Sequence, residues 1–235
     1  MSDSRLKIKY FLLLFTFVFL ITSSKANKMD TKLNPARFKK EISLKELLEK
    51  RFSCRDFQKK PLKIDDIATL LWATCGQKYD AVTHATRTIP SAGATYPLEL
   101  YLVTGENSVE AMQAGVYHYL IQNHSLKLIA NGDQRQALAF ACLGQSFIGT
   151  SPASIVIAAK FNRTMSRYGT RGRRYVYMEA GSAAQNTYLS AVNLGLATIA
   201  IGAFDDAVVK KTLSLENDVE PLIVLPIGYP VQWEK

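Results

Sequence analysis

The sequence predicts a single domain that combines α-helices with β-strands. Its 235 residues include 48% hydrophobic side chains, which is enough to bury one substantial core. Segments with the apolar spacing of helices alternate along the chain with short runs rich in branched residues, which are typical of strands. One α/β or α+β domain therefore fits the sequence better than two domains.

Residues 1–26 have the features of a signal peptide. Residues 5–9 are positively charged, residues 10–22 are almost entirely apolar, and residues 24–26 include small side chains suited to signal peptidase. The apolar run is shorter than the ~20 residues that usually span a bilayer, so a retained membrane anchor is the weaker alternative. We expect cleavage after residue 26, export to the periplasm or the medium, and no stable membrane insertion of the mature chain.

The charge and the cysteines narrow the range of functions. The formal charge is +9, of which +3 lies in residues 1–26, and the remaining +6 favours anionic ligands. Cys54, Cys75 and Cys142 are an odd number and lack the spacing of zinc ligands. Neither a fully paired disulfide framework nor a metal site is expected.

Two helices are predicted near the start of the mature chain. Residues 27–42 are polar and lysine-rich, and we expect them to form a linker or arm before a domain at residues 43–235. Ser43 and Glu46 have the spacing of a capping box, which predicts a helix that begins at residue 44. A second amphipathic helix is expected from Asp65 to Cys75.

The loop between these two helices is a candidate phosphate clamp. It contains Arg51, Ser53 and Arg55. A guanidinium group can bind a phosphate through two hydrogen bonds, and serine adds a short donor. Arginines that face solvent or cap a helix are the alternative. Cys54, between them, is expected only to fill space.

The middle of the chain is predicted to contain a small-residue loop and several strands. Residues 86–97 form the loop, in which Gly93 and three small neighbours would let the backbone approach a flat aromatic ligand. A strand is expected at residues 98–104 and a hairpin at residues 115–129. His118 and His124, in that hairpin, are expected to be structural.

The second half alternates helices and strands around a basic segment. Residues 163–174 carry five arginines with tyrosines close by, a pattern that also occurs where single-stranded nucleic acid binds. Because the cluster is single and local, nucleic-acid binding is not expected. The remaining predicted elements are helices at residues 133–144, 175–195 and 205–213 and strands at residues 153–160, 196–203 and 221–230.

Five motifs, at residues 51–55, 87–97, 167–172, 179–186 and 201–206, follow one another in a familiar order. Together they resemble the flavin-dependent nitroreductase superfamily, in particular its SagB/ThcOx-type branch, whose better-known members oxidise azolines in ribosomal peptides. The resemblance covers residues 44–230. It implies an α+β nitroreductase-like fold with a central, mostly antiparallel sheet flanked by helices, and a homodimer with FMN at the interface.

The resemblance also implies roles for individual residues. Tyr168 and Arg171 are expected to contact the substrate or donate a proton, and Glu179 is expected to pair with one of the preceding arginines. Backbone donors near the ring edge are expected because reduction places negative charge there. The positions that match the cofactor contacts of the family are Arg51, Ser53, Arg55, Pro90, Ser91, Ala92, Gly93, Gln185, Ala200, Gly202 and Ala203.

Two departures from the family pattern affect these expectations. Many members continue beyond the position of Gly228 and add a further cation to the phosphate, so more of the phosphate binding is expected from the clamp here. The Lys-Tyr pair of azoline oxidases matches Arg167 and Tyr168, and arginine is a poor proton acceptor. This substitution argues against azoline oxidation.

The predicted function is therefore that of an FMN-dependent oxidoreductase of the SagB type. It would pass electrons or hydride between a donor and a small-molecule or peptide substrate. One alternative is a non-catalytic flavin or small-ligand binding protein of the same fold. Another is a surface-anchored basic module for adhesion or nucleic-acid binding.

Overall fold

A seven-stranded antiparallel sheet forms the centre of the molecule. The computed structural model describes residues 30–38, 41–82 and 84–233, so the predicted signal peptide lies outside the described residues. All strand pairs of this sheet are antiparallel, which confirms the predicted α+β fold class. The strands follow in the order β1 (Thr31–Lys32), β6 (Ser125–Asn131), β5 (Gly115–Leu120), β4 (Leu98–Thr104), β7 (Ala153–Ala159), β9 (Glu220–Gly228) and β8 (Ala197–Thr198).

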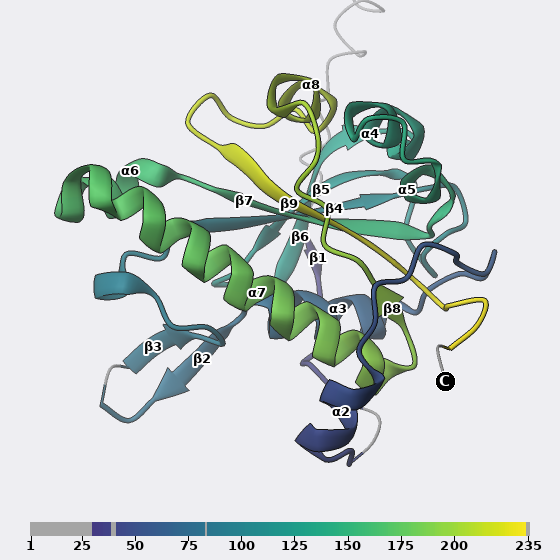
Figure 1. The fold of residues 1–235 in the computed structure, drawn as a ribbon, viewed down its shortest axis with the longest axis horizontal. Coiled ribbons are helices and arrows are strands. Elements are labelled where there is room, and N and C mark those ends of the chain that lie inside the picture. The colour runs from purple at the N-terminus through teal and green to yellow at the C-terminus, as the bar shows by residue number, and fades with distance from the viewer. Residues whose placement is uncertain (1–29, 39–40, 83, 234–235) are drawn as a thin grey trace, which may run out of the picture.

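Helices cover both faces of the sheet. Figure 1 shows one layer above the sheet and another below it. The upper layer contains α4 (Arg135–Ala141), α5 (Ser146–Thr150) and α8 (Asp206–Thr212), and the lower layer contains α2 (Leu44–Lys50), α3 (Ile64–Cys75) and α7 (Gly172–Leu194).

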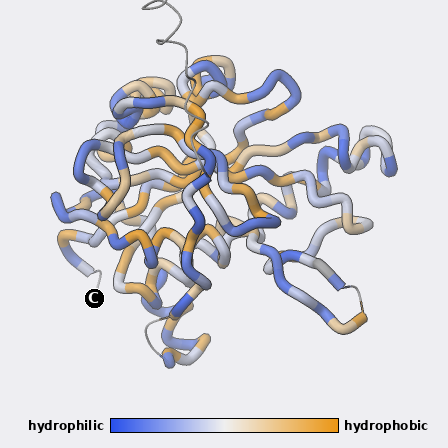
Figure 2. Tube along the Cα trace, turned by 180° about the vertical axis from the view of Figure 1, so that it is seen from behind, coloured by the Kyte–Doolittle hydropathy of each residue, from blue (hydrophilic) through white to orange (hydrophobic). Residues whose placement is uncertain are grey.

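The two faces of each central strand serve different cores. On β7, Ile155 and Ile157 point toward the layer of α3 and α7, while Val156 lies in a second cluster with residues of α4 and α8. Such a strand is apolar on both faces, which explains its unbroken Ile, Val and Ala sequence. Figure 2 shows the hydrophobic residues concentrated along these strands, with polar residues toward the periphery.

The long helix α7 runs across the lower face and ends at Gly195, which adopts a left-handed conformation (φ 75°). Two side-chain hydrogen bonds fix α7 to α3. The hydroxyl groups of Thr187 and Thr74 lie 2.8 Å apart, and the Asn186 side chain donates to the Ala73 carbonyl over 3.0 Å. One side of α7 is thereby buried, and its other side remains available to solvent.

Most predicted elements are present, with several differences. The strand expected at residues 196–203 is interrupted after Thr198 and pairs again only at Ile201, opposite Val224. Residues of the basic segment form a helix, α6 (Phe161–Tyr168), which the sequence pattern did not predict. A small hairpin of β2 (Gln77–Asp80) and β3 (His84–Arg87) precedes the small-residue loop.

The predicted arm packs against the domain where it is described. Strand β1 pairs with β6, and the backbone of Arg37 donates to the Thr69 hydroxyl. Phe38 contacts Trp72 edge to face. Among the described residues, no helix has the length and apolar character that crossing a membrane requires.

Candidate functional site

The Arg51–Arg55 loop lies where α2 ends, next to strand β8. Helix α2 is capped by the Ser43 hydroxyl, which accepts from the Glu46 N–H as the capping-box spacing predicts. The loop then pairs with β8, since the Cys54 N–H donates to the Thr198 carbonyl over 3.0 Å. This pairing fixes the clamp residues to an edge of the central sheet.

Tyr188, on α7, joins the clamp loop to the segment after β8. Its hydroxyl lies 3.1 Å from the Ser53 hydroxyl and accepts from the Ala200 N–H over 2.8 Å. Its ring lies beneath the guanidinium of Arg51, 5.3 Å from the ring centre. The structure thus brings together Arg51, Ser53 and Ala200 around a residue that the sequence motifs did not point to.

The clamp carries positive charge that no carboxylate of the described residues neutralises. Among the ion pairs of the described residues, none includes Arg51 or Arg55. Arg55 is exposed and Arg51 is half-buried. The guanidinium of Arg51 near the Ser53 hydroxyl, with the exposed Arg55 two residues further along the loop, is a donor set that suits a phosphate monoester. The residues present therefore fit the phosphate of a mononucleotide.

The Pro90–Gly93 loop lies near the other end of α7. The Ala92 N–H donates to a carboxylate oxygen of Glu179 over 2.9 Å, and the Ser91 hydroxyl accepts from the Tyr96 N–H. The expectation that Glu179 pairs with an arginine is wrong, because its carboxylate faces this loop. Burial raises the pKa of Glu179, although its hydrogen bonds to Ala92 and Ser91 act in the opposite direction.

Gly93 adopts a conformation and a position that favour glycine. Its φ is 58°, in the left-handed region. A β-carbon there would lie 2.5 Å from the Tyr168 hydroxyl oxygen and 2.9 Å from a guanidinium nitrogen of Arg167. Tyr168, the predicted catalytic residue, is therefore packed against the small-residue loop that was predicted to lie against the cofactor.

Helix α6 holds this loop in place through three consecutive contacts. Arg163 donates to the Tyr96 carbonyl over 2.9 Å, and Arg167 donates to the Gly93 carbonyl over 3.0 Å. Between them, the hydroxyl groups of Thr164 and Thr95 lie 2.8 Å apart. Residues 163, 164 and 167 share one face of a helix, so this face of α6 binds the loop and fixes its position.

The other predicted site residues are distributed along α7 and beside it. Arg171 is exposed, with its guanidinium 5.9 Å from the centre of the Tyr175 ring. Gln185 is exposed on α7. Gly202 lines an open cavity of about 560 Å³ with Arg173 and Tyr177, from the first turns of α7, and Ala203, next to it, is exposed.

The predicted site therefore consists of two groups in one chain. The clamp group adjoins Tyr188, whereas the loop group adjoins Glu179, nine residues earlier on the same helix. A helical rise of 1.5 Å per residue places these two positions about 14 Å apart along α7. The segment from Ala200 to Gly202 extends from the clamp group toward the first turns of α7.

The histidines and cysteines have structural surroundings, as expected. His118 lies 2.7 Å from Glu99, and His124 lies between the Tyr119 hydroxyl and the Asn34 carbonyl. All three cysteines are buried outside disulfides, and burial raises the pKa of Cys75 and Cys142 to about 12. No cluster of potential metal ligands occurs among the described residues.

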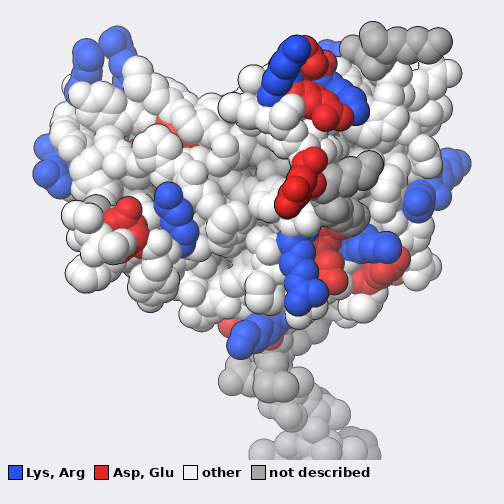
Figure 3. Space-filling view, turned by 90° about the horizontal axis from the view of Figure 1, so that it is seen from below, with Lys and Arg blue, Asp and Glu red and all other residues white. Residues whose placement is uncertain are grey.

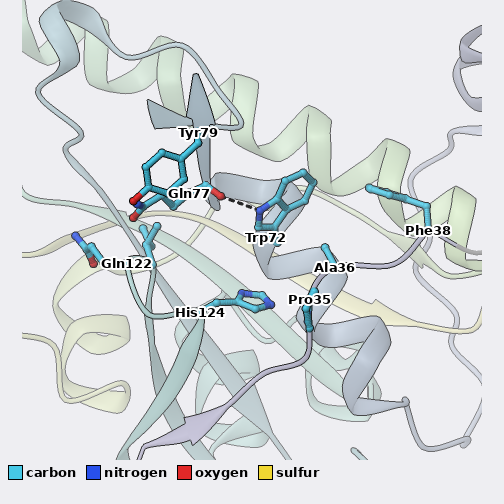
Figure 4. A pocket seen from close by; sticks show the side chains of 9 residues that line it. Pro35, Ala36, Phe38, Trp72, Gln77, Tyr79, Gln122 and His124 are labelled. Carbon is cyan, nitrogen blue, oxygen red and sulfur yellow. Dashed lines mark hydrogen bonds between the residues drawn. The ribbon is translucent and has the colours of Figure 1, made fainter. Parts of the chain in front are cut away.

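A separate cavity of about 510 Å³ lies between the arm, α3 and the β2–β3 hairpin. Figure 4 shows Phe38, Trp72 and Tyr79 around it, with the Trp72 ring nitrogen donating to the Gln77 carbonyl. The predicted site residues do not line it. It therefore plays no part in the site formed around α7.

The fold is an α+β sheet flanked by helices, and comparison with known proteins identifies its family. The Nitroreductase family matches residues 48–229, so the chain belongs to the nitroreductase family. This confirms the family resemblance and makes the chain a nitroreductase-family oxidoreductase.

Two similar proteins come from Methanocaldococcus jannaschii and Escherichia coli. A protein of Methanocaldococcus jannaschii that is named as a nitroreductase is 39% identical over 82% of this chain and 93% of its own length. The microcin B17-processing protein McbC of Escherichia coli is 34% identical over 60% of this chain, which spans about half (54%) of McbC.

A solved structure shows the same fold. A chain of the E. coli microcin synthetase McbBCD complex with truncated pro-MccB17 bound superposes with a TM-score of 0.67 and 30% identity. The match covers 86% of this chain and 78% of that one. The likeness to this complex and to McbC agrees with the SagB-type branch.

Proposed function

We propose that this protein is an FMN-dependent oxidoreductase of the SagB type. It would transfer hydride or electrons between a donor and a small-molecule or peptide substrate. The observation that carries the proposal is the clamp: Arg51 and Arg55 have no carboxylate partner among the described residues, and Arg51 lies over the Tyr188 ring, whose hydroxyl is within hydrogen-bond distance of Ser53. Membership of the nitroreductase family supports the choice of flavin over other nucleotides.

The residues of this chain would divide the work between binding and chemistry. Arg51, Ser53 and Arg55 would bind the phosphate, and the Pro90–Gly93 loop would cover the ring. When bound, FMN supplies a ring that accepts a hydride and passes it on. The exposed backbone at Gly202 and Ala203 is free to offer N–H groups to the ring edge, whereas the Ala200 N–H is already used by Tyr188.

Tyr168 is the residue we propose for substrate contact or proton donation, with Arg171 beside it. The Tyr168 hydroxyl lies at Gly93, in the loop proposed to cover the ring. Its ring meets the Tyr175 ring at right angles with centroids 5.2 Å apart, which limits its movement. Arg171 carries a permanent charge suited to a carboxylate or carbonyl of the substrate.

We further propose that two copies of the chain complete the site. Met178, Gly181 and Gln185 are exposed at positions three and four residues apart on α7, and nothing lies within 4 Å of a β-carbon built at Gly181. On α2, Leu44 and Leu48 are 64% and 51% exposed. An apolar helix face of this kind suits a second copy, whose Pro90–Gly93 loop would meet the clamp of the first.

The test is flavin retention in matched variants. Arg51→Ala removes one charge-assisted contact to the phosphate, so we expect FMN to bind about 10- to 100-fold more weakly. The control is Lys50→Ala, which changes the neighbouring cation that pairs with Glu46 and should keep its yellow chromophore. Flavin absorbance of the purified proteins gives the answer, and full occupancy in Arg51→Ala would falsify the clamp.

One observation favours non-catalytic flavin binding as the second candidate. Arg167 stands where azoline oxidases have lysine, and its guanidinium is engaged with the Gly93 carbonyl. A side chain that holds the loop is not available to accept a proton. Stopped-flow mixing with NADH or NADPH separates the two candidates. Only in the enzyme would the donor reduce the flavin rapidly and so remove its yellow absorbance.

Export is also a proposal. It rests on the charged start and apolar run of residues 1–26. Expression of the full chain followed by cell fractionation should place the protein outside the cytoplasm, with its N-terminus at Asn27. A full-length chain in the cytoplasmic fraction would show that the segment is not processed.

A further inference from the structure

A small cavity of about 210 Å³ lies behind the Pro90–Gly93 loop, between the end of β3, strands β4 and β5, and helix α6. Its lining combines two arginines with polar and apolar side chains, in particular Arg87, Arg163, His118, Gln122, Leu98 and Leu120. The volume is below the 300 Å³ or more of typical ligand pockets, so only a small molecule would fit.

Arg87 is the unusual residue of this cavity. It is only 8% exposed, yet none of the ion pairs among the described residues includes it. Among the described residues, its Nε has no hydrogen-bond partner, and its guanidinium makes one long hydrogen bond (3.4 Å), to the carbonyl of its neighbour Thr86. A buried charge without a counter-ion is costly, so this position favours an anionic partner.

The one carboxylate that lines the cavity is already engaged. Glu99 accepts from Arg163 over 2.6 Å through one oxygen and lies 2.7 Å from His118 through the other. Both oxygens of Glu99 are therefore used by residues of α6 and β5. Neither oxygen balances the charge of Arg87. With Arg87 and Arg163 against a single carboxylate, the cavity has an excess positive charge that favours an anion.

We propose that Arg87 binds the carboxylate of a small organic acid in this cavity. The guanidinium suits a planar carboxylate, and the apolar side chains of Leu98 and Leu120 suit a short hydrocarbon body. Arg87 also stacks on Tyr96, with its guanidinium 4.8 Å from the ring centre, and the Tyr96 N–H donates to Ser91. The bound acid would therefore stabilise the loop that carries Gly93.

The first test measures thermal unfolding with propionate, with propanol as the uncharged control and with phosphate, at constant ionic strength. Propionate should raise the midpoint of unfolding and propanol should not. Equal effects of propionate and propanol would overturn the proposal. Protection by phosphate without protection by propionate would overturn the assignment to a carboxylate.

Variants locate the effect. Titration calorimetry should show propionate binding about tenfold more weakly to Arg87→Gln and to Gln122→Glu, which places a negative charge at an exposed residue of the cavity lining. The exposed Lys211→Gln, which removes a charge on α8, is the matched control and should bind as the wild type does. If Arg87→Gln does not fold, Gln122→Glu decides alone.

A last comparison separates this cavity from the phosphate clamp. Arg51→Ala should keep the response to propionate, because Arg51 does not line the cavity. Loss of the response in Arg51→Ala together with its retention in Gln122→Glu would show that the acid binds at the clamp and would overturn the proposal. This outcome is independent of whether the clamp holds FMN.

Discussion

At the scale of single residues, the hydroxyl of Tyr188 has a larger role than any motif suggests. It lies within hydrogen-bond distance of Ser53 and accepts from the Ala200 N–H, and so connects α7, the clamp loop and the segment after β8. These residues are far apart in the sequence. A tyrosine on a helix carries no local signal of such a contact, so only the fold reveals it.

Replacing this hydroxyl should weaken both the fold and the clamp. Tyr188→Phe removes two hydrogen bonds at a partly exposed position, so we expect a loss of about 0.5–1.5 kcal/mol in the free energy of unfolding. Flavin retention should fall as well, because Ser53 loses its support. Tyr79→Phe, at an 82% exposed tyrosine, is the control. Chemical denaturation measures stability. Unchanged flavin retention in Tyr188→Phe would show that this hydroxyl does not support the clamp.

Gly93 and Gly195 offer a matched pair of left-handed glycines, with φ of 58° and 75°. Gly195→Ala should cost about 1–2 kcal/mol from backbone strain alone, since nothing lies within 4 Å of its β-carbon. Gly93→Ala should cost more and should displace Tyr168, because its β-carbon meets the Tyr168 hydroxyl. Denaturation curves and flavin reduction rates of both variants check this. Equal losses in the two would exclude a special role for the loop.

Glu99 should make the stability depend on pH in acid. Burial alone raises the pKa of Glu99, but hydrogen bonds from His118 and Arg163 and the charge of Arg163 outweigh it and hold the pKa below its ordinary value of 4.5. A lowered folded pKa contributes stability that is present above pH 4.5 and lost as the pH falls through the folded pKa.

The variant Glu99→Gln should therefore be destabilised by about 1–3 kcal/mol at pH 7. The difference from the wild type should shrink as the pH falls below 4.5, because the unfolded chain binds the proton first and the folded carboxylate is protonated only below its lowered pKa. Urea denaturation at pH 7 and pH 4 tests both expectations. The control is Glu49→Gln, which removes the carboxylate of an exposed ion pair with Lys45 on α2. A difference that grows in acid would contradict the sign of the shift.

At the scale of elements, α7 organises the site. Its buried side is fixed to α3 by Thr187 and Asn186, and its exposed side carries Met178, Gly181 and Gln185. The clamp group and the loop group are about 14 Å apart along this helix, at Tyr188 and Glu179. The geometry gives a reason for two copies of the chain to share the exposed side.

If two copies meet on this side as we propose, a bulky residue at Gly181 should separate them without harming the single chain. Gly181→Leu fills space that is empty in one chain, so its thermal stability as a monomer should be kept while the dimer is lost. Ala137→Leu, at an exposed position of α4, controls for added apolar surface. Light scattering coupled to size exclusion gives the mass. A dimer that persists in Gly181→Leu would place the interface elsewhere.

The sequence patterns predicted elements well where one physical rule dominates. Strand β4 was predicted with its observed bounds, and Ser43 caps its helix as expected. Helix α6 was missed because arginines that bind loop carbonyls look like a charged surface when read along the sequence. The strand after Leu196 is shorter than predicted because the Ala200 N–H bonds to Tyr188 instead of a neighbouring strand.

At the scale of the whole molecule, the fold class and the family could be inferred, whereas the arrangement of the site could not. Small residues and arginines in a given order indicate the family, but the distance between the two groups along α7 depends on tertiary packing. Figure 3 shows lysines and arginines interspersed with acidic residues on the face it presents, so on that face the net charge does not gather into one patch.

The place of β9 has a consequence for how this chain is made. Strand β9 lies between β7 and β8, and its residues Leu225 and Ile227 are fully buried. During synthesis, β7 is complete well before β9 leaves the ribosome. Until β9 pairs with it, β7 has an unpaired apolar edge that is exposed to other chains. A nascent or prematurely terminated chain would thus carry a template for aggregation, and chaperones would have to shield it during synthesis.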